Sequence, residues 1–279
     1  MFDSPSVARL YQTHVKSGLY CVGCGMPKKF QLQRPELSEE LAGKLASAQW
    51  ARDHQRLMAV RLAMSGELTL AQIGTLDCGR LLAEFPRAEV VRGNKIATLP
   101  EVFALADSYQ AGVRYNIETK VEADNPSRSA DPQQFVDVIL AAVRSAGKVD
   151  RVEIESFDWR TLPLVRQAEP SIPLVALWDE QTWTPNSPWL AGIDPVVVGD
   201  PVIGAMEVGA NILSPAYQLV DGAFVDHAHA LGLKVIPWTV NDADAMRQQI
   251  TAGVDGIITD YPTLLRGVLA ELGMPLPPA

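Results

Sequence analysis

The chain has 279 residues, of which 47% are hydrophobic and 20% charged, a balance typical of one large globular domain with a sizeable core. Its formal net charge of -9 excludes a non-specific hold on nucleic acid or on an anionic membrane surface. It does not exclude a phosphate-bearing substrate, because a bound cation reverses the field locally.

No stretch reaches the roughly 18 consecutive apolar residues of a membrane span. The start of the chain also lacks the charged, apolar and small-residue regions of a signal peptide. The sequence therefore predicts a protein without a membrane span, located in the cytoplasm.

The first part of the chain, residues 1–67, is predicted to be an atypical and mainly helical segment. Apolar residues recur at intervals of three and four over Pro35–Met64, and Ser38 can cap this helix. Leu68–Leu82 has the same pattern, and a further helix is expected to begin near Pro100.

From about residue 113 onward, short β-rich runs alternate with helical segments. This alternation predicts βαβ units and a parallel sheet. So many units in so short a stretch favour a closed, TIM-type β/α barrel over an open doubly wound sheet, and no G-x-G-x-x-G follows any of the runs. The predicted strands are Val113–Lys120, Arg151–Phe157, Ile172–Trp178, Val196–Val198, Ala210–Ser214, Lys234–Val240 and Gly256–Thr259, and the predicted helices between them include Pro132–Ala146 and Gly222–Ala230.

The run Val113–Lys120 has one polar face. Because side chains alternate across a strand, this face consists of Arg114, Asn116, Glu118 and Lys120. In a barrel the outer face packs beneath helices, so the polar face is expected to point inward, where it needs water, a ligand or mutual contacts. Glu118 and Lys120 come at the carboxyl end of the strand, where active sites of barrels lie. The alternative is an edge strand with one solvated face.

The next run places Glu155 at the same rim as Glu118. Two carboxylates from neighbouring strands suit a hard cation such as Mg²⁺ or Ca²⁺, and they suit an acid/base pair equally well. A third possibility is that Glu155 forms an ion pair with Lys120 or Arg114. Two histidines, His227 and His229, lie two apart on a predicted helix, face different directions, and are interpreted as surface or packing residues.

Five motifs in order resemble the signatures of the glycerophosphodiester phosphodiesterases, a family of phospholipase-C-like phosphodiesterase barrels. The resemblance covers about residues 68–266. Its motifs are Asn116-Ile-Glu-Thr-Lys120, Ser156-Phe-Asp-Trp159, Ala228-His-Ala-Leu-Gly232, Trp238-Thr-Val-Asn241 and Gly253-Val-Asp-Gly-Ile-Ile-Thr-Asp-Tyr-Pro262.

The resemblance implies a β/α-barrel domain over residues 68–270. Residues 271–279, which end in a proline-rich stretch, are predicted to form a disordered tail. It implies metal-dependent cleavage of a small glycerophosphodiester to glycerol 3-phosphate and an alcohol. Glu118 is then one of three carboxylate ligands to one divalent cation, Mg²⁺ or Ca²⁺. Glu155 stays a second candidate ligand because of its place on the neighbouring strand, not because of the resemblance. Lys120 lies near the phosphate, Trp238 lines the substrate side, and Arg114 is a further candidate contact for the phosphate.

The family's amino-terminal motifs, His-Arg-Gly, Glu-x-Asp and His-Asp, are absent from this sequence. His14 and His54 are the candidate acid/base histidines, but Leu41 stands where an Asp is expected and the region has helical periodicity. The barrel is therefore expected to be incomplete or irregular at its first strands. Two alternatives to hydrolysis follow: an impaired or truncated barrel that binds phosphate-bearing ligands without turnover, and a chain that does not fold stably.

Overall fold

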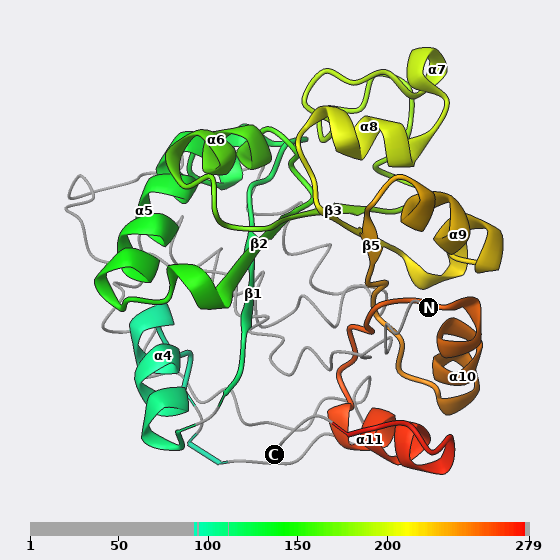
Figure 1. The fold of residues 1–279 in the computed structure, drawn as a ribbon. Coiled ribbons are helices and arrows are strands. Elements are labelled where there is room, and N and C mark those ends of the chain that lie inside the picture. Colours follow the sequence, from blue (N-terminus) through cyan, green and yellow to red (C-terminus); the bar gives the residue numbers. More distant parts are fainter. Residues whose placement is uncertain (1–91, 94, 111, 277–279) are drawn as a thin grey trace. The chain divides into compact units, whose positions relative to one another are not determined.

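The computed structural model describes residues 92–93, 95–110 and 112–276 (Figure 1). These residues fall into two compact units divided between Leu105 and Ala106, and every strand of the described residues belongs to the unit that contains Ala106–Ala279. The helices predicted over Pro35–Met64 and Leu68–Leu82, and the candidate histidines His14 and His54, lie outside the described residues.

A parallel sheet of five strands forms the core of the larger unit, and the strands lie side by side in their chain order. A doubly wound sheet reverses its order at a switch point, whereas a β/α barrel adds each strand beside the previous one. The order therefore supports the predicted barrel, although the described strands do not close on themselves. The strands are β1 (Tyr115–Thr119), β2 (Val152–Ser156), β3 (Leu174–Trp178), β4 (Ile212–Pro215) and β5 (Lys234–Val235).

Helices follow the strands as predicted, and Figure 1 shows α5 to α11 in an arc along the outer side of the strands. Helix α5 illustrates the packing, because Val136, Ile139, Leu140 and Val143 recur at helical spacing and are all buried. The helices of this unit are α5 (Pro132–Ser145), α6 (Thr161–Ala168), α7 (Pro195–Val198), α8 (Pro201–Glu207), α9 (Gly222–Ala230), α10 (Ala243–Ala252) and α11 (Pro262–Glu271), with short 3₁₀ turns η2 (Pro126–Arg128), η3 (Val149–Arg151) and η4 (Tyr217–Leu219).

The prediction of a strand at Val196–Val198 was wrong, because these residues form the short helix α7. The Asp194 carboxylate accepts a hydrogen bond from Val196 N at 2.9 Å, Pro195 occupies the first turn, and Gly199 ends the helix with a φ of 70°. This cap, proline and glycine outweigh the strand preference of three valines. Val196 and Val197 are 72% and 82% exposed, so they contribute nothing to the core.

The last two predicted strands are shorter or less regular than expected. Strand β5 covers only Lys234–Val235, because Pro237 lacks the N–H that a ladder needs. Beyond it, Trp238 still forms a bridge with Ala216. The segment predicted as Gly256–Thr259 is not a regular strand, but Ile258 N donates to Pro237 O at 2.9 Å and Ile258 O accepts from Val240 N at 2.9 Å. It therefore continues the parallel arrangement beside β5.

Helix α4 (Leu99–Ser108) begins one residue before the predicted start. Thr98 N and Thr98 Oγ1 both donate to Glu101 Oε2, at 2.7 and 2.8 Å. These hydrogen bonds lower the pKa of Glu101 below its usual 4.5.

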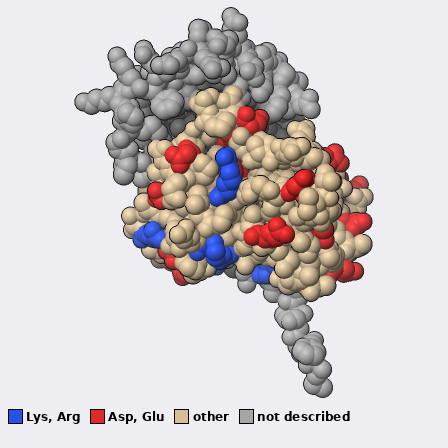
Figure 2. Space-filling view, turned by 90° about the horizontal axis from the view of Figure 1, so that it is seen from above, with Lys and Arg blue, Asp and Glu red and all other residues tan. Residues whose placement is uncertain are grey.

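Acidic and basic side chains are interspersed on the face of the described residues seen in Figure 2. None of the helices in the part of the chain that the structure describes combines the length and apolar character needed to cross a bilayer.

Candidate active site

The predicted alternation of β1 is confirmed. Tyr115, Ile117 and Thr119 are buried, whereas Asn116, Glu118 and Lys120 share the other face and are partly exposed. Because β2 is buried at every position, the carboxylates of Glu153 and Glu155, which share one of its faces, are removed from bulk water as well.

Glu118 stands directly opposite Glu155 in the register of β1 with β2. The Glu118 side chain is 9% exposed and forms an ion pair with Lys120 Nζ, while Glu155 is 4% exposed. The structure therefore brings together three of the predicted residues, two carboxylates and one ammonium, at the carboxyl end of the first two strands. Both buried carboxylates need positive or hydrogen-bonding partners there.

Asn116 is the partner of Glu155 that sequence reasoning did not single out. Its Nδ2 donates to Glu155 Oε2 at 2.6 Å, and its own Oδ1 is buried without a hydrogen-bond partner. The signal available in the sequence was the alternation of side chains along a strand. It puts Asn116 on the polar face of β1, and the same alternation along β2 gives Glu155. A buried amide oxygen with no donor is unusual in a folded protein, and an oxygen of this kind can serve as a ligand to a cation.

Arg114 lies at the other end of β1. Its Nε contacts Glu153 Oε1 at 3.3 Å, and its Nη1 donates to Asp150 O at 3.0 Å. Four residues of strand separate it from Glu118, which corresponds to about 13 Å. The structure does not bring Arg114 to the carboxylates.

The donor set at this edge fits part of a divalent cation site. Mg²⁺ and Ca²⁺ take carboxylate and amide oxygens, and Glu118, Glu155 and Asn116 Oδ1 are of these kinds. Within residues 92–93, 95–110 and 112–276 no cluster of three or more His, Cys, Asp or Glu side chains could hold a metal. At this edge the described residues place two carboxylates opposite each other, those of Glu118 and Glu155.

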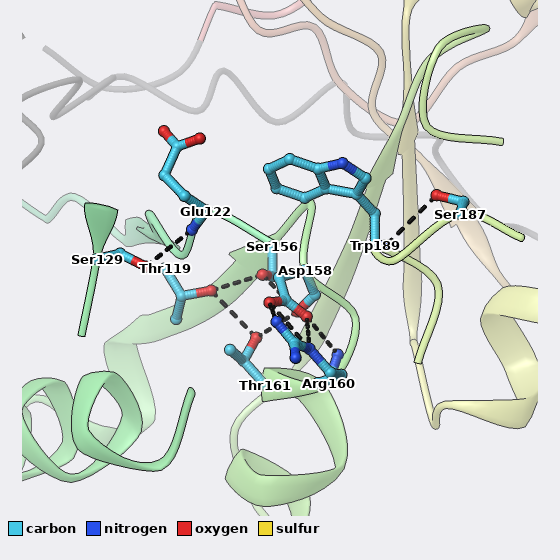
Figure 3. Close-up of polar contacts among 9 residues, drawn as sticks. All are labelled: Thr119, Glu122, Ser129, Ser156, Asp158, Arg160, Thr161, Ser187 and Trp189. Atoms are coloured by element: carbon cyan, nitrogen blue, oxygen red, sulfur yellow. Dashed lines mark hydrogen bonds and ion pairs between the residues drawn. The ribbon is translucent and has the colours of Figure 1, made fainter. Parts of the chain in front are cut away.

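A buried hydroxyl network supports the opposite face of β1 and β2 (Figure 3). Thr119 Oγ1 donates to Ser156 Oγ at 2.6 Å and lies 3.1 Å from Thr161 Oγ1 at the start of α6. Both Ser156 and Thr161 donate in turn to Asp158 O, at 2.8 and 2.9 Å. Since the network joins the two strand ends to α6, it fixes the backbone from which Glu118 and Glu155 project.

The Asp158 carboxylate is fully buried and is held by Arg160. Arg160 N and Nε donate to Asp158 Oδ1 at 3.1 and 2.8 Å, and Nη2 donates to Oδ2 at 2.5 Å. These hydrogen bonds raise the pKa of Arg160. The pair closes the turn after β2, where a lone buried carboxylate would be costly.

Trp238 lies at the carboxyl end of the sheet, where it forms a bridge with Ala216 beyond β4 and β5. Its Nε1 donates to Ser214 O at 2.7 Å, and its ring contacts Phe157 at a centroid distance of 5.2 Å. Trp189, which sequence reasoning missed, contacts the other side of this cluster, 6.4 Å from Phe157. Trp189 comes from an irregular connection without periodicity, so only the density of tryptophans near it signals a role.

His227 and His229, the histidines of the described region, lie on α9. They contact Asp200 and Asp255 at 2.7 and 2.8 Å, and their side chains are 48% and 40% exposed. Their interpretation as surface residues is confirmed.

The strands follow one another in chain order, and acidic side chains lie at the carboxyl edge of the sheet. This arrangement is typical of β/α-barrel enzymes. The model of the glycerophosphoryl diester phosphodiesterase family matches residues 45–264, and the chain belongs to this family. The predicted family and enzyme class are thereby confirmed, and the match begins at residue 45 rather than 68.

Two relatives named glycerophosphodiester phosphodiesterase are similar in sequence. One, from Caldanaerobacter subterraneus, is 28% identical over 207 residues, which cover 74% of this chain and 73% of the relative. Another, from Bacillus subtilis, is 28% identical over 225 residues, which cover 78% of this chain and 66% of the relative.

Solved structures agree on the fold. A Silicibacter pomeroyi structure that carries the same family name has 28% identity and a TM-score of 0.64, and the match covers 76% of this chain and 71% of that one. An Oleispira antarctica phosphodiesterase, solved in complex with the product sn-glycerol-3-phosphate, has 18% identity and a TM-score of 0.55, with 74% and 72% covered.

Proposed function

We propose that the chain hydrolyses glycerophosphodiesters to glycerol 3-phosphate and an alcohol, with a divalent cation held in part by Glu118 and Glu155. The observation that carries the proposal is the register of these two carboxylates at the carboxyl edge of the sheet, with Lys120 beside Glu118. Family membership supports the reaction class, and the product complex of the Oleispira enzyme supports the identity of the product.

Glu118, Glu155 and the unpartnered Asn116 Oδ1 would hold the cation from one side. When bound, the cation polarises the phosphoryl oxygens and offsets the charge that develops as the P–O bond breaks. Asn116 Nδ2 donates to Glu155 Oε2 and so keeps the Glu155 carboxylate turned towards β1. Mg²⁺ and Ca²⁺ both fit this oxygen-only set.

Lys120 would contact the phosphate. In the structure its ammonium pairs with Glu118, so a cation and Lys120 compete for the same carboxylate. Cation binding would therefore free the ammonium to meet a non-bridging phosphate oxygen, which supplies charge and orientation together.

Proton transfer needs an acid and a base near the scissile bond. His14 and His54 remain the candidate histidines and lie outside the described residues. Glu155 is the further candidate, because it is buried and accepts a hydrogen bond at the cation-binding edge. The cytoplasmic location expected from the sequence stays a prediction.

The direct test is release of glycerol 3-phosphate from glycerophosphocholine by the purified full chain, with Mg²⁺ or Ca²⁺ and with a chelator. Cation-dependent release supports the proposal. Folded protein that binds glycerol 3-phosphate in a calorimeter but releases none from the diester contradicts it and favours the binding-only barrel.

A further inference from the structure

The helices that return the chain from one strand to the next begin with the same type of residue. Helices α5, α8, α9 and α10 each have an aspartate as the N-cap, and its side chain accepts a backbone N–H of the first turn. Serine and asparagine cap helices as well as aspartate does, so capping alone does not require a charge at these positions. We call these residues, Asp131, Asp200, Asp221 and Asp242, the cap aspartates.

The cap aspartates lie around the edge of the sheet that carries the candidate site. Because the strands are parallel, each connecting helix has to begin near the carboxyl edge of the sheet. Glu118 and Glu155 stand at this same edge. Figure 1 shows the capped helices spread along the outer arc, so their carboxylates surround the edge instead of forming a cluster that could bind an ion.

The cap aspartates reverse the usual electrostatic effect of helix N-termini. A helix N-terminus carries about half a positive charge and attracts phosphate, whereas an aspartate there adds a full negative charge. In Asp131, Asp221 and Asp242 it is Oδ1 that accepts the capping hydrogen bonds, at 2.8 to 3.1 Å, and all three residues are exposed. Asp200 also contacts His227 at 2.7 Å. The edge is therefore repulsive to anions at long range.

This repulsion acts unequally on the substrate and the product of the proposed reaction. A phosphodiester group carries one negative charge, whereas glycerol 3-phosphate carries nearly two above neutral pH, because the second pKa of a phosphomonoester is about 6. We infer that the cap aspartates weaken the binding of glycerol 3-phosphate relative to the diester and so limit inhibition by the product. This inference rests on the proposed function for the identity of the product.

The size of the effect follows from distance and ionic strength. Three carboxylates at roughly 15 Å, about one helix diameter beyond the strands, disfavour one further negative charge about two- to fourfold in water at low salt. At about 0.5 M salt the Debye length is only about 4 Å, so this repulsion disappears. Contact-range attraction by a bound cation and by Lys120 acts in a partly buried environment and is screened much less.

The test removes three of the charges and keeps the caps. The cap variant combines Asp131→Asn, Asp221→Asn and Asp242→Asn, and the asparagine oxygen accepts the same N–H groups. Glycerophosphoglycerol is the substrate, because its alcohol is uncharged, and the ratio of Ki for glycerol 3-phosphate to KM is measured with saturating Mg²⁺ at about pH 8. We expect this ratio to be about two- to fourfold higher in the wild type than in the cap variant at about 10 mM salt, and equal at about 0.5 M.

A control variant separates the position of the charges from the net charge of the chain. It combines Asp150→Asn, immediately before β2, Glu207→Gln, at the last residue of α8, and Asp226→Asn, on α9 beyond its first turn. These exposed residues lie away from the carboxyl edge, so the control should keep the wild-type ratio at both salt concentrations. A control that changes the ratio as much as the cap variant does overturns the inference.

Binding separates failure of this inference from failure of the proposed function. If the diester is not hydrolysed, calorimetry gives the affinities of the same two compounds, and the ratio of their Kd values replaces the kinetic ratio. Equal ratios in the wild type and in a cap variant with unchanged melting temperature overturn the inference. If the cap variant melts at a lower temperature, the wild type decides alone: a ratio that falls with added salt supports the repulsion, and a ratio that salt leaves unchanged overturns it.

Discussion

Glu118 of β1 and Glu155 of β2 face each other as register partners where both strands end. Two carboxylates at this spacing repel each other in a partly dry environment. Lys120 and Asn116 offset part of this repulsion by pairing with Glu118 and Glu155 respectively. A divalent cation between the carboxylates would offset the rest, which is why their register is the centre of the functional proposal.

Glu155→Gln tests whether Glu155 is a cation ligand. Glutamine keeps an oxygen that accepts from Asn116 Nδ2 but removes the charge, so we expect the cation concentration for half-maximal activity to rise about 10- to 100-fold. The melting temperature without cation should stay the same or rise, because repulsion from Glu118 is relieved. Glu169→Gln, which alters a surface pair with Arg144, is the matched control. An unchanged cation requirement with lower stability would assign Glu155 to a structural ion pair instead.

Lys120→Met separates phosphate binding from cation binding. Loss of the ammonium should raise KM for the diester about tenfold or more, because one charged hydrogen bond to the phosphate is lost. The same change should lower the cation concentration for half-maximal activity, since Nζ no longer competes for Glu118. Lys234→Met, at the exposed start of β5, should change neither quantity. A higher cation requirement in Lys120→Met would contradict the competition.

Thr119→Val tests the hydroxyl network behind the carboxylates. The substitution keeps the shape of the side chain but removes the hydroxyl that contacts Ser156 and Thr161, so unfolding free energy should fall by about 1–3 kcal/mol. Thr251→Val is the control, because that exposed hydroxyl bonds only within α10 and its loss should cost less than about 0.5 kcal/mol. Urea denaturation measures both, and equal effects would show that the network adds nothing.

Glu101 predicts a pH dependence at the start of α4. Its pKa is lowered in the folded chain by the hydrogen bonds from Thr98, so the ionised carboxylate stabilises the helix above the pKa of the unfolded chain. This stabilisation is lost as the pH falls through the lower folded value. NMR titration of the Glu101 carboxyl carbon should give a pKa below 4.5. The Glu101→Gln variant should lose less stability on acidification. An unshifted pKa of Glu101 would show that the hydrogen bonds from Thr98 do not stabilise its ionised carboxylate.

The sequence predicted the parallel strands and the alternation of side chains along β1 because both follow from local periodicity, period two in the strands and 3.6 in α5 and α9. It failed at Val196–Val198, where β-branched residues are overridden by a capping Asp and a glycine with positive φ. Helix capping depends on a few specific residues, here Asp194 and Gly199. The strand preference of three consecutive valines outweighed this signal in the prediction.

In the candidate site, too, residues on periodic strands could be predicted and residues in irregular loops could not. Glu118, Lys120 and Glu155 were found because alternation and strand ends can be read along the chain. Trp189 was missed because it lies in an irregular loop, where hydrogen bonds from Trp159 N to Trp189 O and from Trp189 N to Ser187 Oγ place it, and no strand or helix periodicity encodes these contacts. Arg114 shares a face with Glu118, but its distance along β1 keeps it with Glu153.

Glu118 carries the central claim, and one variant tests it most directly. Wild-type chain and Glu118→Gln are compared for cation-dependent release of glycerol 3-phosphate from glycerophosphocholine, with circular dichroism to establish that both are folded. The account predicts release by the wild type that a chelator abolishes, and a loss of at least about 100-fold in kcat for the variant, the scale of removing one electrostatic contact to a transition state. Equal release by Glu118→Gln, or release that the chelator leaves unchanged, would contradict it.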